Sequence, residues 1–210
     1  MQDTNWAKAL KPLVAKYKDN KHPLDYVNLY QLMVTVVLAA QDSDAHINKL
    51  SPALFEKFPT LKTLAKAEKD DLHPLIGKVR GFNKKADWLI GIAQEVKDDK
   101  NLPTTMKDLT ALKGIGRKSA NVIMREAEVK PEGIMVDLHV LRVVPRLGIS
   151  QAKTGDKMEK DLMAELPQEM WGEIGMAISF LGRETCRPTN PKHSECVLNK
   201  VCEYCQLHNK

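Results

Sequence analysis

The sequence predicts an all-α protein, and three observations support this fold class. Apolar residues recur every three or four positions in most segments, and no segment shows the alternation typical of a half-buried strand. Prolines lie between these segments and divide the chain into short helices. Hydrophobic residues fill 43% of the 210 positions, a share that supports a packed core and argues against disorder.

Two helices are expected near the N-terminus. Residues 6–17 place large apolar side chains at helical spacing, and a charged run ends this helix before Pro23. Asp25 is expected to cap a second helix over residues 26–40, which is apolar on nearly every side. Its longest apolar run, residues 32–40, is far shorter than the roughly 20 residues that span a bilayer. We therefore expect a buried helix at the centre of a helical domain, and no membrane span.

Short amphipathic helices are expected through the middle of the chain. They are predicted near residues 53–58, 61–67, 70–76 and 84–97, separated by Pro52, Pro59, Pro74 and Pro103. A further short helix is expected over residues 105–112, because Met106, Leu109 and Leu112 share one face. No internal repeat or low-complexity tract interrupts the series.

A glycine-rich turn follows that last helix. Residues 112–116 read Leu-Lys-Gly-Ile-Gly and lead directly into a second helix that begins near Arg117. Gly114 and Gly116 allow backbone angles that other residues avoid, and they let a phosphate approach main-chain N–H groups at the helix N-terminus. The stretch is thus predicted to form a helix-hairpin-helix, whose usual ligand is a DNA phosphate.

Lys118 lies in the first turn of this second helix. The positive helix end and the neighbouring Arg117 both disfavour the ammonium form, and a neutral lysine amine is a nucleophile that forms Schiff bases. An acid follows nineteen residues later, since Asp137 is placed to cap a helix that starts at Leu138. The pair suggests covalent catalysis on bound DNA, beyond binding alone.

These two stretches closely resemble the helix-hairpin-helix DNA glycosylases, and among them the endonuclease III family of glycosylases with AP-lyase activity. Residues 112–122 match the family's hairpin, and residues 136–143, Val-Asp-Leu-His-Val-Leu-Arg-Val, match the segment that bears its catalytic aspartate. The resemblance implies that Lys118 is the nucleophile and Asp137 the catalytic carboxylate of a base excision repair enzyme. The implied substrate is duplex DNA with a damaged base, usually an oxidised pyrimidine.

The resemblance also implies a two-domain organisation. One helical domain covers residues 23–132 and ends in the helix-hairpin-helix, and the other joins residues 1–22 to residues 133–210, which carry a cysteine-ligated metal-cluster loop. Lys118 and Asp137 are expected to face each other across the cleft between these domains, as in the family. The hairpin residues expected to grip the DNA backbone are Gly114, Ile115, Gly116 and Arg117.

Residues 41–44, Gln-Asp-Ser-Asp, resemble the family segment that opens the next helix. In the family the glutamine of this segment enters the DNA stack beside the extruded base, so Gln41 is the candidate for that role. The alternative is a polar residue that only caps a helix end. Asp44 is expected to be structural, as an N-cap.

A second candidate DNA-contact loop surrounds Gly81 and Phe82. It resembles the family loop that wedges into DNA beside the flipped nucleotide, where an apolar side chain must replace the lost stacking. The family has a bulky apolar residue at the position of Gly81, so either Phe82 or Val79 takes over, or the contact to the opposite base differs. The alternative is a surface turn before a helix. The candidate phosphate ligands here are Arg80, Lys84 and Lys85.

All four cysteines fall between Cys186 and Cys205, and this clustering suits a metal site better than disulfides. The family carries a [4Fe-4S] cluster at this end of the chain, but with a different cysteine spacing. Aligning the flanking residues makes Cys186, Cys196 and Cys202 three of the ligands and puts His193 at the remaining position.

Two ligand sets therefore stay open. Cys205 supplies the fourth thiolate of a Cys₄ site, or His193 ligates and Cys205 stays free. We favour a [4Fe-4S] cluster; zinc on three or four of these residues, or no metal, are the alternatives. In each case the role is structural, with Lys192, His193 and Lys200 as candidate phosphate contacts.

The net charge and the N-terminal residues indicate the kind of partner and the location of the protein. Lys plus Arg exceeds Asp plus Glu by 32 − 27 = 5, and the pI near 8.9 suits a polyanionic partner such as DNA. Residues 1–5 are polar and show no targeting signal, so we expect a cytoplasmic, DNA-associated monomer.

Two competing functions remain. A monofunctional glycosylase that removes adenine or alkylated bases would share the fold, but such enzymes lack the nucleophilic lysine. A non-catalytic DNA-binding or redox-sensing protein would use only the hairpin and the cluster. Such a protein would bind an abasic site without nicking the strand, and it would tolerate loss of Asp137.

Overall fold

The computed structural model describes residues 4–208, and over this range the chain is all-α with no strand. The predicted fold class is therefore confirmed. The chain divides into two compact units: a central unit, Lys21–Ala127, and a terminal unit made of Met1–Asn20 and Glu128–Lys210. Each described helix falls short of the length and apolar character that crossing a membrane requires.

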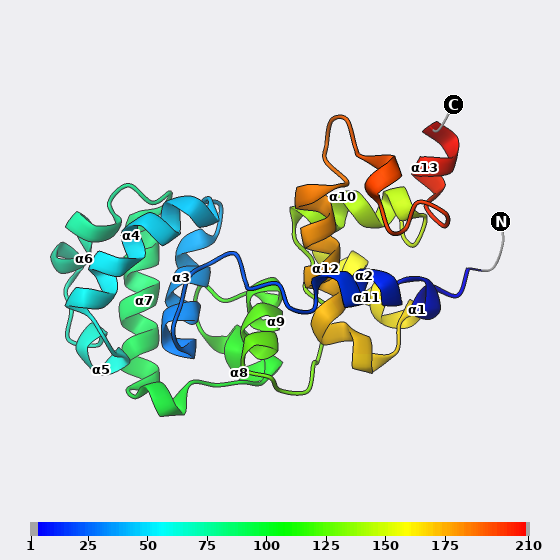
Figure 1. Cartoon of the computed structure of the whole chain (residues 1–210). Helices are drawn as coiled ribbons and strands as arrows, with labels where there is room; N and C mark the ends of the chain where they lie inside the picture. The colour runs from blue at the N-terminus through cyan, green and yellow to red at the C-terminus, as the bar shows by residue number, and fades with distance from the viewer. Residues whose placement is uncertain (1–3, 209–210) are drawn as a thin grey trace. The chain divides into compact units, whose positions relative to one another are not determined.

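The central unit is built around the predicted buried helix. Its elements are α3 (Leu29–Ala39), α4 (Asp44–Lys57), α5 (Leu61–Leu64), α6 (Lys69–Ile76), α7 (Phe82–Val96), η1 (Asp99–Asn101), α8 (Met106–Ala111) and α9 (Arg117–Glu126). Every side chain from residue 32 to residue 38 of α3 is buried. Helix α7 packs on α3, α5 and α6, and α9 packs on α3 and α8 (Figure 1). Burial of α3 thus fixes the positions of both α7 and α9.

The terminal unit is organised around α12 (Trp171–Glu184), which packs most extensively on α10 and also on α2 (Figure 1). Its other elements are α1 (Trp6–Ala9), α2 (Lys11–Tyr17), α10 (Leu138–Leu147), α11 (Gly155–Glu165), η2 (Gln168–Met170), η3 (His193–Glu195) and α13 (Glu203–His208). A Cβ on Gly175 of α12 would lie 2.3 Å from the Met135 carbonyl oxygen, so only glycine lets the segment around Met135 pass so close to α12. That crossing leads the chain into Asp137.

The predicted start of α3 is wrong. The helix begins at Leu29, and its N-cap is Asn28, whose side-chain oxygen accepts a hydrogen bond from the Gln31 N–H at 2.9 Å. Asp25 does not cap this helix, because the cap position lies three residues beyond it. The Asp25 N–H instead donates to Asn48 Oδ1 at 3.0 Å and ties the preceding loop to α4. Tertiary contact therefore shifts the start of the helix by three residues.

The predicted N-cap of α4 is also wrong by one residue. Ser43 is the cap, with its hydroxyl accepting from the His46 N–H at 3.2 Å, and Asp44 is the first helical residue. The acid still suits this place, since a carboxylate in the first turn favours the positive helix end. Gln41 does not open the helix; it lies in the turn before it with a left-handed φ of 61°.

The prolines divide the chain less than expected. Pro52 lies inside α4 and Pro74 inside α6, so neither ends a helix. Packing of buried α4 side chains such as Leu54 on neighbouring helices outweighs the one backbone hydrogen bond that Pro52 removes. Conversely, the single helix predicted over residues 6–17 is two helices that meet at Leu10, because Pro12 suits the first turn of a new helix.

Candidate active site

The helix-hairpin-helix is present as predicted. The N–H of Ile115 donates to the Leu112 carbonyl at 3.2 Å and closes the turn, and both side chains are buried. Gly114 has a left-handed φ of 90°, and Gly116 is the N-cap of α9. With its side chain buried and its N–H used in the turn, Ile115 could contact DNA only through its carbonyl.

Trp88 of α7 packs directly against this turn. A Cβ built on Gly114 would lie 2.6 Å from the Trp88 ring, whereas a Cβ on Gly116 would meet nothing within 4 Å. Lys84, one turn earlier on α7, places its ammonium 5.5 Å from the centre of the same ring. The fold therefore requires a glycine at position 114, whereas the space around Gly116 would accommodate a side chain.

We expect these glycines to respond differently to alanine. Gly114→Ala combines a strained φ with a clash on Trp88, and should lower the free energy of unfolding by about 2 kcal/mol or more. Gly116→Ala should leave the urea midpoint nearly unchanged but weaken binding to an abasic duplex, because a methyl group then stands at the helix N-terminus. Equal midpoints for the two variants would contradict this assignment.

Lys118 is the second residue of α9 and is exposed. Among residues 21–127, its amine makes no hydrogen bond or ion pair. Its charge reaches the imidazole of His22: burial lowers the pKa of His22, and Lys118 and Arg125 lower it further against the opposing effect of Glu126. The lysine thus stands at a positive helix end with its amine directed to solvent and a neutral imidazole nearby.

Asp137 is held by three hydrogen bonds. Its Oδ1 accepts from the N–H groups of His139 and Val140 at 2.8 and 2.9 Å, so the predicted cap of α10 is confirmed. Its Oδ2 accepts from the Ser179 hydroxyl at 2.6 Å. Ser179 lies fully buried on α12, 42 residues away, and no sequence pattern pointed to it. Cap and hydroxyl together fix the orientation of the carboxylate.

This arrangement predicts which Asp137 variant keeps the fold. Asp137→Ala removes the cap and leaves the buried Ser179 hydroxyl without its acceptor, and should lower the free energy of unfolding by about 1 to 2 kcal/mol. Asp137→Asn keeps a capping oxygen, and its amide can donate to Ser179, so it should lose about half as much or less. Urea unfolding of both variants beside Ser179→Ala checks the order.

His139 hydrogen-bonds within the terminal unit. Its Nδ1 lies 3.2 Å from an Arg142 terminal nitrogen, which also donates to the Gly182 carbonyl at 2.8 Å. Arg142 Nε donates to the Cys186 carbonyl at 3.3 Å. Arg142 therefore joins α10 to the end of α12 and to the start of the cysteine segment.

The two candidate DNA-contact loops lie at the ends of helices in the central unit. Gln41 is exposed in the turn between α3 and α4. Gly81 is the N-cap of α7, with a left-handed φ of 71° and open space around it. Val79 is buried, which leaves half-buried Phe82, with its ring 4.6 Å from the centre of the His73 ring, as the apolar candidate for a wedge.

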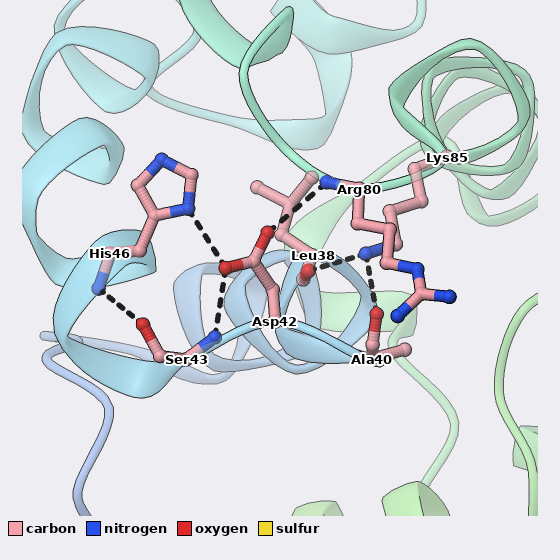
Figure 2. A network of polar contacts seen from close by, with 7 residues as sticks. All are labelled: Leu38, Ala40, Asp42, Ser43, His46, Arg80 and Lys85. Atoms are coloured by element: carbon pink, nitrogen blue, oxygen red, sulfur yellow. Dashed lines mark hydrogen bonds and ion pairs between the residues drawn. The ribbon is translucent and has the colours of Figure 1, made fainter.

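Lys85 is not a phosphate ligand, and that prediction is wrong. Its side chain is only 4% exposed, and its Nζ donates to the carbonyls of Leu38 and Ala40 at 2.7 and 2.6 Å (Figure 2). Burial lowers the pKa of this lysine; the charge of Asp42 opposes this effect and the charge of Arg80 adds to it. Of the three cations proposed at this loop, Lys84 and Arg80 remain exposed.

The cysteine segment surrounds a single cavity. Cys186 follows α12, Cys196 follows η3, Cys202 precedes α13 and Cys205 lies within α13. All four side chains, with His193, line the same small cavity. Arg146 of α10 connects the parts: its guanidinium donates to Cys186 Sγ and its carbonyl accepts from the Cys202 thiol, both at 3.3 Å. The same guanidinium lies 4.7 Å from the Tyr204 ring centre.

Comparison with known proteins agrees with this geometry. Residues 34–168 match the HhH-GPD superfamily of base excision DNA repair proteins. Over 185 residues the chain is 35% identical to an endonuclease III from Synechocystis sp., covering 87% of this chain and 84% of that protein. The chain belongs to the endonuclease III family. It is a base excision repair glycosylase.

Two further endonuclease III proteins support this family membership. The enzyme from Thermotoga maritima is 33% identical over 183 residues, covering 86% of this chain and 85% of that protein. A solved structure described as a trapped endonuclease III–DNA covalent intermediate superposes with a TM-score of 0.85 at 30% identity, covering 97% of this chain and 96% of its own. The resemblance that the motifs suggested is therefore confirmed.

The four cysteines from Cys186 to Cys205 are ligands that both iron–sulfur clusters and zinc accept. Among residues 4–208, no three His, Cys, Asp or Glu side chains are grouped closely enough to hold one metal ion. The four thiols line one cavity together with His193. Burial raises the pKa of the Cys196 and Cys202 thiols, so a positive centre would be needed to hold them as thiolates.

Proposed function

We propose that this chain is a bifunctional DNA glycosylase and AP lyase that removes damaged bases, usually oxidised pyrimidines, from duplex DNA. The observation that carries the proposal is the exposed Lys118 amine in the first turn of α9, directly after the glycine hairpin. A similar solved structure holds endonuclease III covalently bound to DNA, which is the kind of intermediate that a lysine nucleophile forms.

In the proposed reaction the damaged nucleotide is first extruded from the duplex. The Lys118 amine attacks the C1′ carbon of the sugar with its lone pair, and the base leaves with the electrons of the glycosidic bond. The sugar ring then opens: the C1′–O4′ bond breaks, O4′ leaves with its electron pair and takes up a proton, and the nitrogen lone pair forms the C1′–nitrogen double bond of a Schiff base as the amine loses a proton. Loss of a proton from C2′ then expels the 3′ phosphate, and the strand is nicked on the 3′ side.

We assign two roles in this reaction to Asp137. As a carboxylate it accepts the proton that the amine releases, and it stabilises the positive charge that builds on the sugar. The hydrogen bond from Ser179 and the cap of α10 support the proposal, because a carboxylate that acts as a base must keep a fixed orientation.

The remaining contacts of the proposal grip and open the DNA. Gly114, Gly116 and Arg117 would hold the backbone phosphate at the N-terminus of α9, with Lys84 beside them. Gln41 and Phe82, from the two exposed turns, would fill the gap that the extruded nucleotide leaves.

We further propose that Cys186, Cys196, Cys202 and Cys205 hold a [4Fe-4S] cluster with a structural role. Residues 186–208 contain little regular structure, and their buried apolar side chains are few. A cluster on four thiolates would stabilise this fold directly. Cys205 is preferred over His193 as the fourth ligand, because the thiol is buried at the cavity while the imidazole stacks on Tyr204 at 5.8 Å.

The proposal is tested with two duplexes, one carrying an oxidised pyrimidine and one carrying an abasic site. The intact protein should nick the lesion-bearing strand of each duplex, and borohydride should trap it covalently on each, because reduction freezes the Schiff base. If the oxidised base is excised but no adduct and no nick appear, the protein is a monofunctional glycosylase. Binding without excision or trapping would favour the non-catalytic alternative.

A further inference from the structure

A single carboxylate joins two exposed turns, the one that follows α3 and the one that precedes α7. Asp42, the residue after Gln41, accepts a hydrogen bond on Oδ2 from the N–H of Arg80, the residue before Gly81, at 3.1 Å (Figure 2). Its Oδ1 accepts from the Ser43 N–H and lies 2.8 Å from His46 Nδ1. The Asp42 side chain is only 12% exposed. One side chain thus fixes both turns to the start of α4.

Lys85 makes a second link between the same two elements. It belongs to the first turn of α7, and its ammonium donates to the Leu38 and Ala40 carbonyls at the C-terminal end of α3. A cation at this negative helix end is favourable. Because Lys85 is buried, water could not take over its hydrogen bonds to the two carbonyls if the side chain were removed. The residues on both sides of Gln41 are therefore anchored to α7 or to the turn before it.

These anchors explain the backbone of Gln41. A left-handed φ of 61° is unfavourable for glutamine and persists only where the surroundings enforce it. Burial would raise the pKa of the Asp42 carboxyl, but hydrogen bonds from His46, Arg80 and Ser43 outweigh burial and lower it. The carboxylate is thus ionised at neutral pH and able to accept from all its partners.

We propose that Asp42 and Lys85 are positioning residues that hold the Gln41 turn and the Gly81–Phe82 turn in one fixed register for entry into the DNA stack. The inference rests on the proposed function, in which these turns open the duplex. Neither side chain touches the reacting atoms. Their loss should therefore slow extrusion of the damaged base and leave Schiff-base formation at an existing abasic site intact.

The test compares Asp42→Ala with Asp99→Ala. Asp99 is a matched control, because its carboxylate also accepts from a backbone N–H 38 residues away, that of Leu61 at 2.7 Å, in the same unit but at other turns. Single-turnover excision of an oxidised pyrimidine, fluorescence of 2-aminopurine opposite the lesion, and borohydride trapping on an abasic duplex are measured for both.

We expect Asp42→Ala to lower the excision rate and the fluorescence change by roughly 10- to 100-fold, the scale of a small displacement in an active site. Its trapping yield should stay within about twofold of the intact protein. Asp42→Asn should restore most of the excision rate, because its amide oxygen still accepts from Arg80. Asp99→Ala should change neither excision nor fluorescence.

Two outcomes would overturn the inference. Excision by Asp42→Ala at the rate of Asp99→Ala would show that the link does not set the turns. An equal loss of excision and trapping, without recovery in Asp42→Asn, would indicate a purely structural role. The intact protein distinguishes failure of the positioning inference from failure of the proposed function. If the intact protein neither excises the base nor becomes trapped, the proposed function is wrong, and the positioning role is wrong with it.

Discussion

Lys118→Ala is expected to abolish borohydride trapping on an abasic duplex and to lower strand nicking by on the order of 10³-fold or more. The variant loses the only amine that the proposed chemistry uses to form a Schiff base. Lys118 is exposed near the start of α9, so alanine, a good helix former, should leave the fold and the urea midpoint unchanged. The loss would then report chemistry rather than stability.

The matched control is Lys113→Ala. Lys113 is also exposed and lies five residues earlier in the same hairpin, so its removal takes the same charge from the same DNA-binding surface. Binding of the two variants to an uncleaved duplex should weaken to a similar small extent, with only Lys118→Ala losing the covalent adduct. If both variants are trapped like the intact protein, Lys118 is a phosphate contact and the lyase proposal is wrong.

Asp137→Asn is expected to differ from Lys118→Ala, because it should lose excision but keep some covalent trapping. The variant keeps the cap of α10, so its structure should be retained while excision falls by roughly 10²- to 10⁴-fold, the usual contribution of a general base. Some trapping on an abasic site should remain, because the nucleophile is still present. Loss of folding in Asp137→Asn would point instead to a purely structural carboxylate.

Removal of the proposed cluster should have the second large effect, on the terminal unit. Cys202→Ala should abolish the visible absorption and the iron of purified protein and lower the melting temperature by roughly 10 °C, since each kcal/mol of an expected loss of about 4 kcal/mol shifts the melting temperature of a whole protein of 210 residues by roughly 2–4 °C. Cys202 is buried and its thiol donates to the Arg146 carbonyl, so residues 186–208 should become sensitive to protease.

Cys205→Ala and His193→Ala decide between the two ligand sets. With a Cys₄ site, Cys205→Ala should lose iron as Cys202→Ala does, whereas His193→Ala should keep it and lose only the stacking on Tyr204. The reverse result would make His193 the ligand. Zinc instead of iron in the intact protein would replace the cluster by a structural zinc site, and retention of fold without any metal would overturn the cofactor proposal.

Local sequence patterns were sufficient for several parts of the fold. The buried α3, the glycine hairpin and the Asp137 cap each depend on residues within about one or two helical turns, and each was predicted correctly. Errors fell where distant contacts compete with local preference. Asp25 is a good cap by residue type, but its loop is tied to Asn48 of α4, and Asn28 caps the helix, which begins at Leu29.

The largest misassignment, Lys85, has the same cause. A lysine at the start of a helix is usually solvated, and nothing within a few residues shows that it is buried against the end of α3. Helices α11 and α12 were not assigned from the sequence, although α12 forms the core of the terminal unit.

The sequence by itself determined the fold class, the family and the candidate nucleophile, because periodicity, glycine turns and short motifs are encoded in consecutive residues. Tertiary structure alone decided which groups support that chemistry. Ser179 reaches Asp137 across 42 residues, and Asp42 reaches Arg80 across 38. Such pairs form only when separate helices pack. The sequence could not predict them, because neither residue of a pair has a neighbour in the chain that indicates its partner.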